Sequence, residues 1–218
     1  MHTIRSFVAI PLGVEVLRGV RKMARELRSE DDGMKWVPED TLNLTIKFLG
    51  DVVDREVPRV CDVIRRCCES IEPFELTMEG AGGFPSADRP RVVWAGITQG
   101  GESLIELVTR LEKSLADLGF KPESRDYRPH LPLGRVRSGS RAASPEVVQR
   151  VLRLGSRKLG SFQVESVQLF ASYLEKVGPS YSVMDTIYLG AKANESRDDE
   201  VDDDDDEVDD DDFDDDDE

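Results

Sequence analysis

Two short stretches of this chain repeat one pattern, and the repeat restricts the possible fold more than any other feature of the sequence. Residues 43–46 read Asn-Leu-Thr-Ile, residues 130–133 read His-Leu-Pro-Leu, and each tetrad runs on into a glycine. Successive side chains of a β-strand point to opposite faces. The first and third residues of each tetrad therefore share a face: Asn43 with Thr45, and His130 with Pro132. We predict two related strands that each present this pair of side chains to a common site.

The rest of the chain predicts strands interrupted by amphipathic helices. Apolar residues at steps of three and four predict helices over residues 13–28, 57–68 and 104–118. The helix start Ser144-Pro145-Glu146 predicts a short fourth helix over residues 145–154. Strands are predicted over residues 3–10, 34–38, 43–49, 74–78, 91–97, 161–170 and 181–189, with a strand end at residues 50–51 and a turn-rich loop at residues 80–85. Helices separated by runs of strands favour an α+β fold over a doubly wound parallel sheet.

The formal net charge of −16 comes from the C-terminal end of the chain. Residues 195–218 hold 19 acidic residues and one arginine, whereas residues 1–194 hold 28 Lys and Arg against 26 Asp and Glu. An acidic run of this kind cannot bury enough apolar surface to offset chain entropy. We therefore predict a folded domain at residues 1–190 and a disordered acidic tail at residues 191–218. The mildly basic domain suits a ligand that carries phosphate.

Several protein classes are disfavoured by composition. No stretch approaches the roughly 18 consecutive apolar residues of a membrane span, and the N-terminus lacks the apolar core of a signal peptide. The three cysteines, Cys61, Cys67 and Cys68, lie in one predicted helix, and no second Cys or His cluster completes a zinc pattern. We expect a cytoplasmic protein with reduced cysteines and no membrane partner, and we take it to be a monomer.

The tetrads resemble the two signature tetrads of the 2H phosphoesterases, which read His, hydrophobic, Thr or Ser, hydrophobic. The chain is most similar to the RNA 2′,3′-cyclic phosphodiesterases, also called 2′-5′ RNA ligases. Four further stretches resemble that family: Arg5–Ile10, Lys47–Gly50, Arg89–Gly96 and Leu133–Arg135. The resemblance covers residues 3–190. It implies two pseudosymmetric lobes with mainly antiparallel sheets, helices outside, and a central cleft lined by the tetrads.

The resemblance also implies a hydrolysis that needs neither a metal nor another cofactor. A general base activates water, a general acid protonates the leaving ribose oxygen, and hydroxyl groups donate to the charged phosphate. His130 stands at the position of the family's second histidine, and the resemblance implies that it is the base that activates water. Thr45 stands at the position of the family's first hydroxyl group. Arg135 matches a family arginine that contacts phosphate. Simple alternation would put Arg135 opposite His130, so a bulge, for example at Gly134, would have to redirect it.

Two residues depart from the family pattern, and both belong to the tetrads. Asn43 stands where the family has His; it can hydrogen-bond a phosphate or ribose oxygen but cannot exchange a proton near pH 7. Pro132 stands where the family has Thr. It has neither a hydroxyl nor a backbone N–H, so it tolerates only an edge or irregular strand position. His2, the other histidine, could replace the missing acid only if it reached the cleft, and chain ends usually fray.

Three functions are compatible with the sequence. The first is an RNA-processing enzyme, a cyclic phosphodiesterase that gives a 2′-phosphate end, with activity strongly reduced by Asn43 and Pro132. The second is a catalytically silent module that binds RNA ends or cyclic nucleotides through Thr45, Arg135 and the basic face of the predicted helix at residues 13–28. The third is an interaction protein whose acidic tail matters more than its cleft. Nothing in the sequence indicates ligation.

Overall fold

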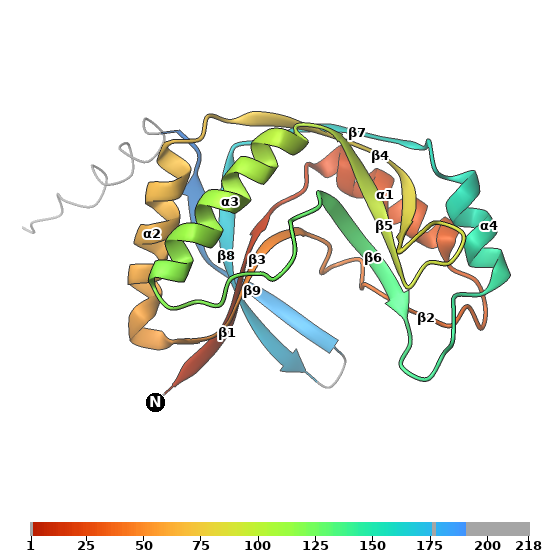
Figure 1. Cartoon of the computed structure of the whole chain (residues 1–218), viewed down its shortest axis with the longest axis horizontal. Coiled ribbons are helices and arrows are strands. Elements are labelled where there is room, and N and C mark those ends of the chain that lie inside the picture. Colours follow the sequence, from red (N-terminus) through yellow and green to blue (C-terminus); the bar gives the residue numbers. More distant parts are fainter. Residues whose placement is uncertain (1, 176–177, 191–218) are drawn as a thin grey trace, which may run out of the picture.

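The computed structural model describes residues 2–175 and 178–190, which form two antiparallel sheets and four α-helices (Figure 1). The first sheet has the strand order β3 (Leu44–Val53), β1 (Thr3–Ile10), β8 (Ser166–Glu175), β9 (Gly178–Tyr188). The second has the order β2 (Met34–Trp36), β6 (His130–Val136), β5 (Val92–Gln99), β4 (Phe74–Phe84), β7 (Lys158–Val164). All neighbouring strands are antiparallel. The predicted α+β fold is confirmed, and the predicted acidic tail lies outside the described residues.

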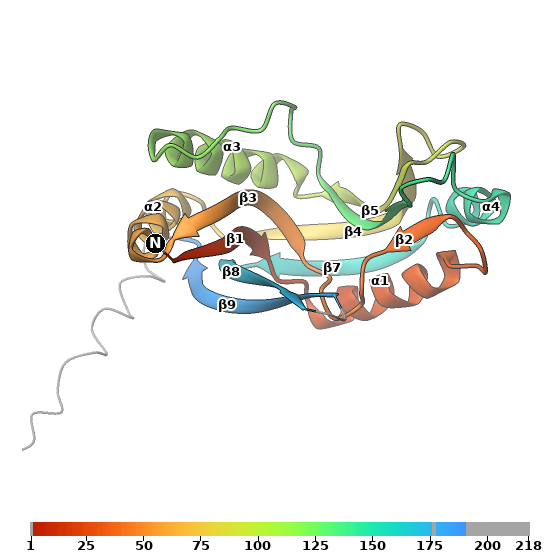
Figure 2. The same ribbon diagram turned by 90° about the horizontal axis from the view of Figure 1, so that it is seen from below.

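The helices cover the sheets in two pairs, one for each lobe. Helices α2 (Val57–Glu69) and α3 (Gly101–Asp117) pack against each other and against the first sheet, at β9 and β3. Helices α1 (Val14–Leu27) and α4 (Pro145–Arg153) pack on the second sheet, at β7 and β4. Figure 2 shows the two lobes side by side, with one pair of helices at each end of the molecule. Each helix buries an apolar stripe along the side that packs against the rest of the protein.

Local signals set the helix ends where the sequence predicts them. Helix α4 begins with Pro145 at its first position, and Ser144 Oγ accepts a hydrogen bond from the backbone N–H of Val147 at 3.3 Å. Helix α3 stops just before Gly119, whose φ of 94° is a left-handed conformation that suits glycine.

Each sheet combines strands from both ends of the chain. The first sheet pairs β1 and β3 with β8 and β9, and the second pairs β2, β4 and β5 with β6 and β7. Helix α1 comes from the start of the chain yet lies on β7, near the end. The two lobes therefore do not correspond to two consecutive halves of the sequence.

The prediction of a loop at residues 80–85 is wrong, because strand β4 continues through this segment to Phe84. Gly80 has a φ of 76° and stands at a bulge against β5, so its positive φ bends the strand instead of ending it. Gly82 lies beneath the indole of Trp94, where a Cβ atom would come within 2.2 Å of the ring. The glycines here make room for an aromatic side chain on a neighbouring strand.

Two further strand boundaries also differ from the prediction. Strand β3 does not end at residues 50–51 but continues to Val53, because the positive φ of Gly50 is absorbed by an irregularity in its pairing with β1. The single strand predicted over residues 161–170 is two strands, β7 and β8, which belong to different sheets and are separated at Glu165. The apolar positions change phase there, from 162 and 164 to 167 and 169, so the two adjacent polar residues Glu165 and Ser166 mark the break in the sequence.

The described helices include none that is long and apolar enough to cross a membrane. Cys61, Cys67 and Cys68 are free and buried in α2. Burial raises the pKa of both Cys61 and Cys68 to about 12, so these two thiols stay protonated and weakly nucleophilic near neutral pH.

Candidate active site

A β-bulge near the start of β3 decides which side chains reach the open face of the first sheet. Thr45 pairs with Ala9 of β1 and Lys47 pairs with Val8, so Ile46 is an extra residue between them. Lys47 points toward α3, where its side chain is buried. Thr45 therefore lies on the opposite face of the sheet, away from the helices.

Asn43 immediately precedes β3 and holds the hydroxyl group of Thr45. Its Nδ2 donates to the carbonyl of Thr41 at 3.0 Å, and its Oδ1 accepts from Thr45 Oγ1 at 2.8 Å. The two side chains that the sequence predicts on one face thus contact each other. Because the Thr45 proton is engaged with Asn43, it must change partners before it can donate to a bound anion.

Strand β6 carries a second bulge, and this one redirects Arg135. Pro132 and Gly134 pair with successive residues of β5, so Leu133 is extra. Beyond the bulge, the partners of Arg135 and His130 on β5 are four residues apart, and both side chains share one face of the sheet. The predicted redirection of Arg135 is confirmed, although the extra residue is Leu133 and not Gly134.

His130, the first residue of β6, is held in one orientation by its neighbours. Its Nδ1 lies 2.6 Å from the carbonyl oxygen of Arg128. A carbonyl accepts only, so Nδ1 carries the proton and, in the neutral ring, Nε2 holds a lone pair. Phe84 meets the imidazole at 5.0 Å between ring centroids and 82°, and Trp94 meets it at 6.4 Å and 68°. Both contacts have the edge-to-face geometry that aromatic rings prefer.

Pro132 occupies the kind of position that proline requires in a sheet. Strand β2 pairs with β6 only over Gly134–Val136 in the described part of the chain. At Pro132, strand β6 is therefore paired with β5 on one side and is an edge on the other. Pro132 is also adjacent to the bulge at Leu133, and it is exposed. The predicted edge or irregular position is confirmed.

The two tetrad strands lie close together although they belong to different sheets. Strands β3 and β6 come within 8 Å of each other at Cα positions. Lys47 of β3 also donates to Glu112 Oε2 at 2.7 Å and to the carbonyl of Lys121 at 2.9 Å, and Glu112 Oε2 accepts from the backbone N–H of Glu123 at 3.2 Å. The segment that holds Lys121 and Glu123 leads from α3 into β6. The buried Lys47 of the first tetrad strand thus binds the segment that leads into the second tetrad strand.

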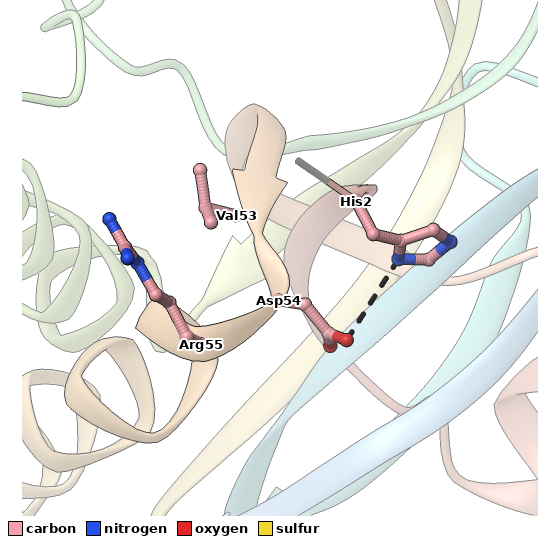
Figure 3. Close-up of a pocket in the computed structure, with 4 residues that line it drawn as sticks. All are labelled: His2, Val53, Asp54 and Arg55. Atoms are coloured by element: carbon pink, nitrogen blue, oxygen red, sulfur yellow. Dashed lines mark ion pairs between the residues drawn. The ribbon is translucent and has the colours of Figure 1, made fainter.

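His2 lies far from this region, at the other end of the β1–β3 pair from Thr45. Its Nδ1 is 3.9 Å from Asp54 Oδ2, and the two residues line a surface pocket with Val53 and Arg55 (Figure 3). The strand between His2 and the partner of Thr45 spans about 20 Å at 3.3 Å per residue. His2 therefore does not reach the tetrads.

The sequence did not single out the two aromatic residues that contact His130. Phe84 falls in the loop predicted at residues 80–85, and Trp94 lies in the stretch Arg89–Gly96, which resembles the family. The available signal is the glycine pair at residues 82–83, because glycine inside a strand marks a close approach by another group. The ring of Trp94 makes that approach over Gly82.

The chain is similar to known proteins in both sequence and fold. The chain matches the model of the LigT-like phosphoesterases twice, over residues 10–94 and 97–181. The RNA 2′,3′-cyclic phosphodiesterase of Methanothermobacter thermautotrophicus is 35% identical over 186 residues, which cover 85% of this chain and 99% of the relative. The enzyme of the same name from Archaeoglobus fulgidus is 33% identical over 178 residues, covering 82% and 96%. The crystal structure of E. coli LigT complexed with 3′-AMP has a TM-score of 0.70 at 26% identity, covering 86% of this chain and 99% of that one. The chain belongs to the LigT-like family of 2H phosphoesterases.

Proposed function

We propose that this protein binds the 2′,3′-cyclic phosphate end of an RNA between its tetrads and opens it to a 2′-phosphate at a strongly reduced rate. The names of the relatives that are 33–35% identical support the substrate class. The observation that carries the proposal is the geometry of His130. Its Nδ1–H is held by a backbone carbonyl, so Nε2 is the nitrogen available to take a proton.

The reaction assigns one role to each of the remaining site residues. His130 Nε2 takes a proton from water, whose oxygen attacks phosphorus, and the bond from phosphorus to the ribose 3′-oxygen breaks. Thr45 donates to a non-bridging oxygen once it releases Asn43, and Arg135 binds phosphate from the facing sheet. The leaving 3′-oxygen takes its proton from solvent water, because Asn43 cannot supply one, and the product keeps its phosphate on the 2′-oxygen.

Asn43 and Pro132 are the reasons for the reduced rate. The family's first histidine would protonate the leaving oxygen, and an amide at that position cannot. A general acid typically contributes about 10²–10⁴-fold to a rate. Pro132 supplies no hydroxyl to the phosphate, and loss of one such donor typically costs about 10²–10³-fold.

The same two residues favour a second candidate function, that of a catalytically silent module. Asn43 can still donate and accept hydrogen bonds, so the site retains groups that bind an RNA end without turning it over. The two functions make different predictions for turnover and the same prediction for binding.

Replacement of His130 by alanine is expected to abolish the residual hydrolysis. Hydrolysis of adenosine 2′,3′-cyclic phosphate, followed by chromatography with EDTA present, should fall at least about 10²-fold, because the base that activates water is lost. His2→Ala is the matched control, since it removes the other histidine about 20 Å away and should leave the rate unchanged. Equal turnover by the His130→Ala protein would overturn the catalytic assignment. Binding without turnover in the unchanged protein would favour the silent module.

A further inference from the structure

The amide of Asn43 is engaged by the protein at both of its polar ends. Its Nδ2 donates to the carbonyl of Thr41 at 3.0 Å, and its Oδ1 accepts from Thr45 Oγ1 at 2.8 Å. These two hydrogen bonds fix the orientation of the amide beside Thr45. An amide held in this way can contact a phosphate with its second N–H hydrogen, but it has no proton to transfer near neutral pH.

The first sheet would have to supply any other acid that assists the leaving group. In phosphoryl transfer the attacking and leaving oxygens lie roughly in line through phosphorus. Because His130 activates the attacking water in the proposed reaction, the leaving oxygen points away from β6. It points toward Asn43, Thr45 and the open face of the first sheet. A proton donor for this oxygen therefore has to lie on that face.

The two rows of side chains at Thr45 on that face carry no proton donor of this kind. The row that crosses the four strands at Thr45 continues with Ala9, Gln168 and Thr186. The next row is apolar and consists of Phe48, Phe7, Phe170 and Val183. None of these side chains exchanges a proton near neutral pH. The ring of Tyr181 packs edge-on against Phe7 at 4.8 Å, and burial raises the pKa of this phenol, which makes it a weaker proton donor.

We propose that this site is matched to phosphodiesters that keep a nucleoside 2′-oxygen on phosphorus and release an acidic hydroxyl group such as a phenol. The inference rests on the proposed function, whose base and phosphate contacts it keeps, and it extends the substrate class beyond cyclic phosphates. His130 Nε2 takes a proton from water, and the water oxygen bonds to phosphorus. The bond from phosphorus to the leaving oxygen breaks, and its electron pair stays on that oxygen. The product is a nucleoside 2′-phosphate, and His130 returns its proton to solvent.

The effect of a missing acid depends on how basic the leaving oxygen is. A general acid contributes about 10²–10⁴-fold, and its efficiency follows Brønsted behaviour, so its loss matters most for the most basic leaving group. A ribose alkoxide is strongly basic. A phenolate is far less basic, since the pKa of the phenol in tyrosine is about 10. Asn43 therefore slows the release of a ribose oxygen much more than the release of an acidic hydroxyl group.

The test measures how the rate depends on the leaving group while the nucleoside stays constant. The substrates are the phenyl and 4-nitrophenyl esters of 3′-deoxyadenosine 2′-phosphate, which lack the neighbouring hydroxyl group that would otherwise attack phosphorus. Release of the phenol by the full chain is followed with EDTA present. The unchanged protein is expected to hydrolyse the nitrophenyl ester at least about 10²-fold faster than the phenyl ester. In the Asn43→His protein this ratio should be at least about tenfold smaller, because the imidazole protonates the leaving phenolate.

Three further variants test the assignment of the groups. Asn43→Gln is the matched control and should keep the steep ratio, since it adds no acid. His130→Ala should lose both activities, and nitrophenol release that survives this change would refute the inference, because the reaction would then take place elsewhere. A steeper ratio for Tyr181→Phe than for the unchanged protein would also refute it, because Tyr181 would then be a replacement acid.

The remaining outcomes separate this inference from the proposed function. Equal ratios for the unchanged and Asn43→His proteins overturn the inference, and hydrolysis of adenosine 2′,3′-cyclic phosphate by the same sample then leaves the proposed function standing. Hydrolysis of the nitrophenyl ester without hydrolysis of the cyclic phosphate has the opposite meaning. If the unchanged protein hydrolyses none of the three substrates, both are wrong.

Discussion

The double variant Asn43→His, Pro132→Thr is expected to hydrolyse adenosine 2′,3′-cyclic phosphate at least about 10³-fold faster than the unchanged protein. The histidine supplies the proton that the leaving 3′-oxygen needs, and the threonine supplies a second hydroxyl donor to the phosphate. The site is prepared for both. Residue 43 already contacts Thr45, and residue 132 lies on β6 between His130 and Arg135, on the same face as both. Initial rates with and without EDTA measure the gain.

The single variants and the pH profile separate the two contributions. Asn43→His alone should introduce a bell-shaped pH dependence, because one imidazole must be neutral and the other protonated. Asn43→Gln is the control, since it changes the shape of the side chain without adding a group that titrates. If the double variant gains no activity while still binding adenosine 2′-phosphate, the tetrads do not hold a cyclic phosphate in the geometry proposed here.

Replacement of Lys47 by methionine is expected to lower the free energy of unfolding by about 3–5 kcal/mol. The Lys47 side chain is 1% exposed and its Nζ contacts Glu112 and the carbonyl of Lys121. Methionine preserves most of the volume but leaves a largely buried carboxylate without its cation. Urea denaturation followed by circular dichroism measures the change.

Two comparison variants test the cause of that loss. Arg59→Met breaks an exposed pair with Glu56, with an N–O distance of 3.9 Å, and should change stability by less than about 1 kcal/mol. Adding Glu112→Leu to Lys47→Met removes the orphaned charge and should recover part of the stability. A loss for Lys47→Met as small as that for Arg59→Met would mean that solvent reaches the buried pair.

The strands that carry the tetrads could be predicted from sequence, because the prediction depends only on the alternation of polar and apolar residues within each strand. Thr45 and His130 lie on strands as expected, and the need for a bulge before Arg135 followed from counting residues from His130. The bulge at Ile46 could not be found in this way. An extra residue shows itself only against the partner strand, and the pairing of β3 with β1 is a contact between distant parts of the chain.

The role of Lys47 was missed for the same reason. By alternation from Thr45, Lys47 would share its open face, and a lysine on an open face needs no explanation. The bulge turns it under α3 and makes it one of the largest fully buried side chains of the protein. Likewise, the glycines at residues 80–83 have the composition of a turn, and only the indole of Trp94 explains why they stay within a strand.

The exchange of strands between the lobes bears on how the chain can be divided. A cut between the two regions that match the family model, near residue 95, would sever β5 and would leave β1 and β3 without β8 and β9, and β4 without β7. Each fragment would then expose strand edges whose partners lie on the other fragment. The internal repeat is therefore one of sequence and not of autonomous folding units. Two fragments produced together would have to assemble as an interlaced pair, and a tetrad strand would reach its partner only in that assembly.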